Sequence, residues 1–155
     1  ARIHAFEPFP DSYEIFTNLH QENLNVHLNK YALSSDIGKA ILNINKSVDT
    51  NSILESKKIG ANSDKSCVSV GRIEIETNTI DNYCIQNNIT EIDILKIDVQ
   101  GSEVKVLKGG LDMLKKGNIK LIYIETYFEQ QYVNQPLFHD ISQLLYKHGF
   151  VLQDI

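Results

Sequence analysis

Several features that mark specialised proteins are scarce in this chain of 155 residues. Two cysteines, Cys67 and Cys84, are too few for a disulfide framework, so we expect reduced thiols and a cytoplasmic protein. The first residues lack the charged and apolar segments of a signal peptide, which agrees with that location. The apolar runs stop short of the roughly 20 residues that a membrane-spanning helix needs, so we expect no membrane span.

Charge and histidine patterns exclude further classes of protein. The formal net charge is -5, from 15 basic and 20 acidic residues, and no block of Lys or Arg supplies the basic surface that nucleic acid requires. The five histidines lack the spacing of metal ligands, so we expect no metal site. With 42% hydrophobic and 23% charged residues, the composition is that of a globular protein of one domain, and it leaves the oligomeric state unknown.

Strand and helix patterns alternate along the chain. The run 92–99 is almost continuously apolar and β-branched, as in a parallel strand covered on both faces. The order of elements is typical of an α/β sandwich with a mostly parallel sheet. The expected strands are 2–6, 26–33, 39–44, 72–76, 92–99, 119–124 and 150–152, and the expected helices are 8–20, 79–86, 102–116 and 137–148.

Three segments add detail to this pattern. The alternating segment 72–76 and the segment 39–44 predict an antiparallel extension at a sheet edge. The polar stretch 45–66 between them predicts a long loop. Gly109 and Gly110 interrupt a helical pattern without a phosphate-loop signature, and they predict a close contact between helix and sheet.

Acidic residues end three of the expected parallel strands, namely Glu7, Asp98 and Glu125. Because open α/β sheets bind ligands at the carboxyl ends of their strands, three acids there predict a polar site along one edge. Glu7 alone has two interpretations that stay open. It is either an acceptor for ribose hydroxyls or a charge that complements the dipole of the following helix.

Other polar residues near these strand ends are candidates for the same site. Lys96 and Asp98 are two apart in a strand and point to one face, where they form either a structural ion pair or part of a cleft. Glu103 begins the next helix, which favours a role at the helix dipole. Three tyrosines either line a substrate entrance or lie half-buried in the core: Tyr123, Tyr127 and Tyr132.

The segment 93–110, DILKIDVQGSEVKVLKGG, resembles the signature of FkbM-family methyltransferases. That signature reads Asp-hydrophobic-Leu-Lys-hydrophobic-Asp-hydrophobic-Glu-Gly-x-Glu, followed by a hydrophobic pair and Lys-Gly. The resemblance implies a Rossmann-like class I methyltransferase that uses S-adenosylmethionine on a hydroxyl of a sugar or secondary metabolite. Weaker elements agree in order and spacing: Ala5-Phe6-Glu7-Pro8 with Pro10, Ala32-Leu33 before Ser34 and Gly38, Thr79-Ile80-Asp81, and Ile122-Tyr123-Ile124-Glu125.

The resemblance also implies roles for individual residues. By this resemblance, Glu7 and the adjoining Pro8 would bind the ribose of the cofactor. The residues near the adenine would be Ala32, Leu33 and Ser34. Asp98, with Lys96, would face the methyl-transfer site.

Two departures from the family pattern stand out. Gln100 replaces the usual Glu, which removes one charge from the rim of the site. The family's first strand and its Asp-x-Gly-x-x-x-Gly loop have no counterpart here, and glycines in that loop let the backbone approach the cofactor closely. We therefore expect residues 1–155 to be the C-terminal portion of a single methyltransferase domain, without its first β-α unit.

The chemistry implied is an in-line displacement at a sulfonium methyl, in which the enzyme aligns a small-molecule hydroxyl and a carboxylate takes its proton. Asp98 is the first candidate for the base and Glu125 the second. Two alternatives stay open: a nicotinamide-dependent Rossmann oxidoreductase, and a non-catalytic module that retains the fold. The signature from Lys96 to Glu103 favours methyl transfer over the oxidoreductase.

Overall fold

The computed structural model describes residues 1–57 and 65–154 of the chain. Over these residues the chain forms five α-helices, two short 3-10 helices and seven strands. The predicted α/β class is confirmed, whereas the described strands are divided among three small sheets instead of lying in one. None of the helices in this part of the chain is long and apolar enough to cross a bilayer.

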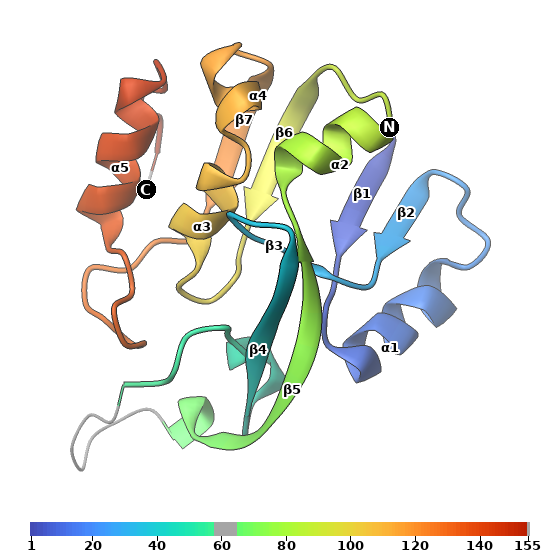
Figure 1. The fold of residues 1–155 in the computed structure, drawn as a ribbon, viewed down its shortest axis with the longest axis vertical. Coiled ribbons are helices and arrows are strands. Elements are labelled where there is room, and N and C mark those ends of the chain that lie inside the picture. Colours follow the sequence, from blue (N-terminus) through green and yellow to red (C-terminus); the bar gives the residue numbers. More distant parts are fainter. Residues whose placement is uncertain (58–64, 155) are drawn as a thin grey trace.

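The N-terminal sheet pairs β1 (Ile3–Phe6) with β2 (Val26–Asn29) in parallel, and α1 (Pro10–His20) connects them. Pro10 opens α1, where the fixed φ of proline suits a helix and its missing N–H costs nothing. No residue of these three elements belongs to the buried core. The helix α1 packs beside β2, at the side of the molecule opposite the C-terminal helix (Figure 1).

The prediction of one strand over 26–33 is wrong. The chain leaves the first sheet after Asn29, and β3 (Ala32–Leu33) pairs in parallel with β5 (Ser69–Asn78) in a second sheet. Lys30 and Tyr31 carry the chain from one sheet to the other. An apolar run does not record which sheet a strand joins, because the neighbours that decide the pairing are distant in sequence.

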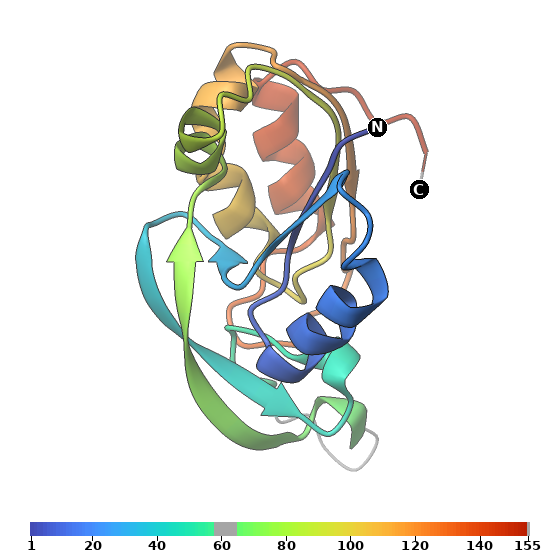
Figure 2. The same cartoon turned by 90° about the vertical axis from the view of Figure 1, so that its right-hand side faces the viewer.

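The second sheet confirms the predicted antiparallel extension. The strand β4 (Gly38–Asn45) pairs antiparallel with β5, and their long ribbon curves toward the end of the molecule that carries η1 (Val48–Thr50) and η2 (Lys65–Cys67) (Figure 1 and Figure 2). Asn45 still belongs to β4, so the loop predicted over 45–66 begins one residue later than expected. Positions 58–64 of that predicted loop lie outside the described residues.

The third sheet pairs β6 (Ile92–Ile97) with β7 (Ile119–Ile124) in parallel. The connection contains α3 (Glu103–Lys108) and α4 (Leu111–Lys115), and α5 (Phe138–Lys147) follows β7. This unit therefore repeats the strand-helix-strand order of the first sheet, with the addition of a second connecting helix.

The single helix predicted over 102–116 is wrong, because the chain breaks it at Gly109 and Gly110. A Cβ on Gly109 would overlap the carbonyl oxygen of Ser34, and a Cβ on Gly110 would lie 3.1 Å from the side chain of Ile80. The glycines thus permit a close approach, as predicted. The neighbours are the backbone that follows β3 and the helix α2 (Ile80–Gln86), not a strand of the third sheet.

The start of α2 also supports α4. The hydroxyl of Thr79 accepts a hydrogen bond from the backbone N–H of Asn82 at 3.1 Å and caps α2. The carboxylate of Asp81 accepts hydrogen bonds from the backbone N–H groups of Asp112 and Met113, at 2.9 and 3.0 Å. Because the first N–H groups of a helix have no partner within it, Asp81 caps α4 from a neighbouring helix.

The core lies between the β6–β7 pair and the helices α2 to α5. Ile97 is 2% exposed on this covered face, whereas Ile94 is 64% exposed and Tyr123 is 66% exposed on the opposite face. The prediction that the strand at 92–99 is covered on both faces is therefore wrong for the described residues, because the helices α2 to α5 all pack against one face. The core cluster consists of Ile80, Cys84, Ile97, Val106, Leu107, Met113, Leu114, Ile119 and Ile141.

The strand predicted at 150–152 is absent from the described part of the chain. Phe150 packs against the core, and its backbone N–H donates to the carbonyl of Leu145 at the end of α5. Val151 and Leu152 are exposed and have no strand partner among the described residues. Of this apolar triplet, Phe150 thus closes α5, and none of the three residues extends a described sheet.

Candidate active site

The carboxyl ends of β6 and β7 lie side by side. Ile97 is in register with Ile124, and the backbone N–H of Glu125 donates to the carbonyl of Ile97 at 2.9 Å. Since parallel strands in register end at the same edge, Asp98 and Glu125 follow their strands into the same region. The local apolar sequences that form the two strands thus place two carboxylates next to each other.

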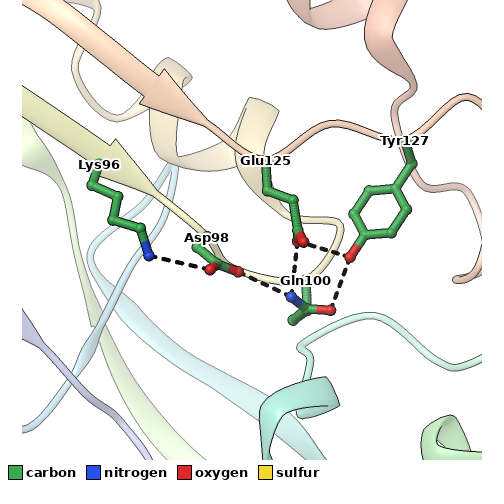
Figure 3. A network of polar contacts seen from close by, with 5 residues as sticks. All are labelled: Lys96, Asp98, Gln100, Glu125 and Tyr127. Atoms are coloured by element: carbon green, nitrogen blue, oxygen red, sulfur yellow. Dashed lines mark hydrogen bonds and ion pairs between the residues drawn. The ribbon is translucent and has the colours of Figure 1, made fainter. Parts of the chain in front are cut away.

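The amide of Gln100 bridges these two carboxylates (Figure 3). Its nitrogen Nε2 donates to Asp98 Oδ1 at 3.0 Å and to Glu125 Oε2 at 2.9 Å. Its oxygen Oε1 accepts from the hydroxyls of Tyr127 at 3.0 Å and Tyr132 at 3.2 Å. A side-chain amide has two donor hydrogens, and the two carboxylates use both of them.

An unusual backbone turn carries Gln100 to this position. Gln100 has a φ of 52°, in the left-handed region, and Gly101 follows with a φ of 97°. The hydroxyl of Ser52 donates to the carbonyl of Gln100 at 2.6 Å. A Cβ on Gly101 would lie 3.1 Å from the ring of Tyr132, so glycine is needed both for the backbone angle and for the space. Contacts from distant segments therefore stabilise a turn that costs about 1–3 kcal/mol by itself.

The two tyrosine hydroxyls act as neutral donors. Tyr127 lies 2.8 Å from Glu125 Oε2 as well as 3.0 Å from Gln100, and its single hydrogen serves one of these acceptors at a time. Burial raises the pKa of Tyr127, and the hydrogen bond to Glu125 raises it further. Burial also raises the pKa of Tyr132, which is almost fully enclosed. Both hydroxyls therefore keep their protons at physiological pH.

Lys96 adds one positive charge at the outer rim. Its ammonium lies 3.3 Å from Asp98 Oδ2, and both side chains are substantially exposed. The prediction that the two side chains share a face is confirmed by this contact. Exposed ion pairs contribute only about 0–1 kcal/mol to stability, so the main effect of Lys96 is on the local charge.

A third carboxyl group lies close to the network. Glu103 is completely buried at the first position of α3, and its Oε1 accepts from the backbone N–H of Gly101 at 2.9 Å. Its Oε2 has no hydrogen-bond partner among the described residues. Burial raises the pKa of Glu103, although backbone N–H groups, including that of Gly101, act in the opposite direction. The helix-start position was predicted from the sequence, but the complete burial was not.

Glu7 occupies a different environment at the end of β1. Its Oε1 accepts from the backbone N–H of Phe9 at 2.8 Å, across Pro8, just before α1 begins. Burial raises the pKa of Glu7, and the hydrogen bond from Phe9 lowers it in part. The arrowheads of β1 and β6 point toward the same end of the molecule (Figure 1), so Glu7 and Asp98 follow strands that end in the same direction.

The segment expected near the adenine lies on β3 and directly after it. Ala32 and Leu33 pair with Thr77 and Asn78 of β5, and Leu33 also packs against the core. Ser34 is buried, and its backbone N–H donates to the carbonyl of Asn78 at 2.8 Å. These contacts connect the segment with β5 and the helical layer, whereas Lys96, Asp98 and Glu125 gather around Gln100.

Some members of the site had no signal in the sequence. Ser52 and Thr50 come from the segment predicted only as a loop, yet Ser52 holds the carbonyl of Gln100 and the carbonyl of Thr50 accepts from the hydroxyl of Tyr132 at 3.0 Å. Of the three candidate tyrosines, Tyr127 and Tyr132 join the network, and Tyr123 lies on the exposed face of β7. In the sequence, Gln100 differs from its neighbours only as a departure from a family pattern.

Parallel strand-helix-strand units with polar groups at their carboxyl ends define a class of α/β proteins that bind ligands at that edge. Comparison with known protein families shows to which family within this class the chain belongs. The model of the methyltransferase FkbM domain family matches residues 1–152, and the chain belongs to this family.

Two curated proteins are similar to the chain. The 2-O-methyltransferase NoeI of Sinorhizobium fredii is 34% identical over 83 residues, which cover 54% of this chain and 33% of NoeI. The hexuronic acid methyltransferase AglP of Haloferax volcanii is 27% identical over 138 residues, which cover 88% of this chain and 53% of AglP. The chain thus spans about a third and about half of the lengths of these relatives. No solved structure gives a significant match.

Proposed function

We propose that this chain is the catalytic part of an S-adenosylmethionine-dependent O-methyltransferase that acts on a hydroxyl of a sugar or secondary metabolite. The observation that carries the proposal is the pair of carboxylates, Asp98 and Glu125, held on one amide at the ends of two parallel strands. Membership of the FkbM family supports methyl transfer over the nicotinamide-dependent alternative. The names of NoeI, a 2-O-methyltransferase, and AglP, a hexuronic acid methyltransferase, support an oxygen acceptor and a sugar-acid acceptor, respectively.

The chemistry of the donor set suits this cofactor. When bound, S-adenosylmethionine supplies a methyl group on a positively charged sulfur. Two carboxylates with one lysine leave a local negative charge, which attracts a cation. A carboxylate such as Glu7 offers acceptor positions to the two hydroxyls of a ribose, with Pro8 beside it. Ala32, Leu33 and Ser34 are our candidates for the surroundings of the adenine.

Asp98 is the proposed base and Glu125 the second candidate. S-adenosylmethionine would supply the methyl group and its sulfur would keep the electron pair of the broken carbon–sulfur bond, while the carboxylate would take the proton of the acceptor hydroxyl. Lys96 and Gln100 fix the orientation of the Asp98 carboxylate, because each contacts one of its oxygens. Holding the acceptor in line with the methyl carbon supplies the larger part of such a rate enhancement, and a positioned base adds about 10²–10⁴-fold.

We also propose that residues 1–155 are a portion of one Rossmann-like domain. Among the described residues β1 pairs with β2 alone and β6 pairs with β7 alone, so each strand has one edge without a partner. Unpaired edges next to a core are costly. A strand from another part of the whole protein, lying between β1 and β6, satisfies both edges and joins the small sheets.

The experiment that tests the function uses the whole natural protein that contains these residues. It is incubated with S-adenosylmethionine and a panel of sugars and sugar acids, and products are analysed by mass spectrometry. We expect one acceptor class to gain a single methyl group at a hydroxyl, with formation of S-adenosylhomocysteine. If calorimetry detects cofactor binding but no acceptor is methylated on oxygen, the acceptor class is wrong. If the whole protein does not bind the cofactor, it is a non-catalytic module.

A further inference from the structure

We propose that Gln100 is a positioning residue that joins Asp98 and Glu125 through a neutral amide, so that the two carboxylates stay together without a bridging cation or a shared proton. This role deepens the proposed methyl transfer and rests on it for its purpose, but the geometry is independent of the reaction. The structure provides three separate observations for it.

The first observation is the distance between the two acids. Asp98 Oδ1 and Glu125 Oε2 both lie within 3.0 Å of the same nitrogen atom, so they are at most about 6 Å apart. Carboxylates this close repel each other, and in proteins such pairs commonly share a proton or bind a metal ion. The two N–H groups of the Gln100 amide stand where that proton or metal ion would otherwise be needed.

The second observation is that the amide has only one satisfactory orientation. Its two N–H groups face two carboxylate oxygens, which only accept hydrogen bonds, and its oxygen lies within hydrogen-bond distance of the hydroxyls of Tyr127 and Tyr132. If the amide turned over, its oxygen would face Asp98 and Glu125, and acceptor would meet acceptor at both positions. The two carboxylates therefore fix the amide with its N–H groups toward them.

The third observation is that distant segments hold the backbone of Gln100 in place. The left-handed φ of 52° is stabilised by the hydrogen bond from Ser52 at 2.6 Å and by the adjoining Gly101. The hydroxyl of Tyr132 lies 3.0 Å from the carbonyl of Thr50 and 3.2 Å from Gln100 Oε1, and its single hydrogen serves one of these acceptors at a time. A side chain that only filled space would not require this support on both its backbone and its oxygen.

These observations predict what a carboxylate does at this position. Glutamate has the shape of glutamine, but an ionised glutamate side chain at position 100 presents a third negative charge to Asp98 and Glu125. Lys96 at the rim is then the single cation described beside three carboxylates, and the buried Glu103 nearby is a further acidic residue. The substitution Gln100→Glu must therefore recruit a proton or a divalent cation. Among the described residues, no group of three or more acidic, His or Cys side chains is arranged to hold a metal ion. Metal binding that the substitution creates can therefore be told apart from binding by the wild-type protein.

The test compares the wild-type whole protein with Gln100→Glu and with the control Gln143→Glu, which adds the same charge on the exposed side of α5. Binding of Mn²⁺, added alone, is measured by calorimetry. The titration of Asp98 and Glu125 is followed by carbon-detected NMR of the side-chain carboxyl groups. We expect Gln100→Glu to bind Mn²⁺ at least tenfold more tightly than the other two proteins. Without metal, we expect the titration midpoint of one carboxyl to rise by at least one pH unit.

The outcomes separate this proposal from the proposed function. If Gln100→Glu matches Gln143→Glu in both measurements, the positioning role is wrong. If wild type already binds Mn²⁺ at this site, and Asp98→Asn abolishes the binding, the proposal is also wrong. If both shifts occur but the whole protein methylates nothing, the positioning role stands and the proposed function fails. Should Gln100→Glu not fold, Gln100→Met removes the donors at similar size, and we expect the same rise in one titration midpoint.

Discussion

The two parallel strand-helix-strand units of this protein have the same topology, but they differ in how many of their residues are buried. In the unit of β6, α3, α4 and β7, buried residues such as Ile97 and Leu107 pack the strands against the helical layer. In the unit of β1, α1 and β2, no residue is buried, and apolar side chains of α1 such as Phe16 and Leu19 are exposed. The strand ends differ accordingly, with a connected polar network after β6 and β7 and a single locally bonded carboxylate after β1.

This comparison shows where rigidity is available for chemistry. The positions of Asp98 and Glu125 depend on paired strands, a buried helix and an amide that donates to both carboxylates, so their geometry is fixed by several contacts. Glu7 depends on one hydrogen bond to the neighbouring backbone. A reacting group must be held within a fraction of an ångström, whereas a group that holds a ribose tolerates more freedom.

The largest expected effect comes from truncating the same residue type in each unit. We expect Ile97→Ala to lower the free energy of unfolding by about 2–5 kcal/mol, because it leaves a cavity in the core. Ile3→Ala, at a position of β1 that is 52% exposed, should cost less than about 1 kcal/mol. Urea unfolding of the whole protein measures both. Equal decreases in the free energy of unfolding for the two variants would show that both units share one core, and the difference in burial between the units would then be wrong.

A second, smaller effect concerns Glu103 beneath the network. Because burial raises its pKa above the usual 4.5, the folded state binds the proton more tightly than the unfolded state. Its contribution to stability is therefore present below pH 4.5 and is lost as the pH rises through the raised value. In Glu103→Gln, we expect the decrease in the free energy of unfolding between acid and neutral pH to be smaller by roughly 1 kcal/mol. Denaturation across that range measures it, with the exposed Glu129→Gln as a control that should keep the wild-type slope.

The smallest effect is expected at the rim. Lys96→Met removes an exposed ion pair with Asp98 and should change stability by no more than about 0.5 kcal/mol. If the loss instead exceeds about 1 kcal/mol, the ion pair between Lys96 and Asp98 stabilises the strand ends by more than an exposed pair ordinarily does. Thermal unfolding at low and high salt separates the charge effect from any loss of packing.

Much of the fold could be predicted from local patterns, and the errors share a cause. Strands β6 and β7 and the antiparallel β4–β5 ribbon follow from periodicity, since each pattern is contained within its own segment. The division of 26–33 into two strands, the break at Gly109 and the open face bearing Ile94 depend on what lies next to each segment. Such neighbours come from distant parts of the chain, which periodicity does not register.

The same distinction holds for the site. The contact of Lys96 with Asp98 and the position of Asp98 and Glu125 at one edge could be predicted, because Lys96 and Asp98 are two residues apart and both acids follow strands with a parallel pattern. The role of Gln100 could not, because it needs a left-handed backbone and partners from the Ser52 and Tyr132 segments. The contribution of Glu7 to cofactor binding stays a prediction.

The central claim is that the end of β6 performs the chemistry and the end of β1 holds the cofactor. The most direct measurement is the turnover and the cofactor dissociation constant of Asp98→Asn and Glu7→Gln in the whole protein, at saturating acceptor. We predict that Asp98→Asn lowers kcat by about 10²–10⁴-fold, with a much smaller change in Kd. Glu7→Gln should weaken cofactor binding by about tenfold, with kcat at saturating cofactor nearly unchanged. Full turnover by Asp98→Asn, or the same parameter changing in both variants, would contradict the account.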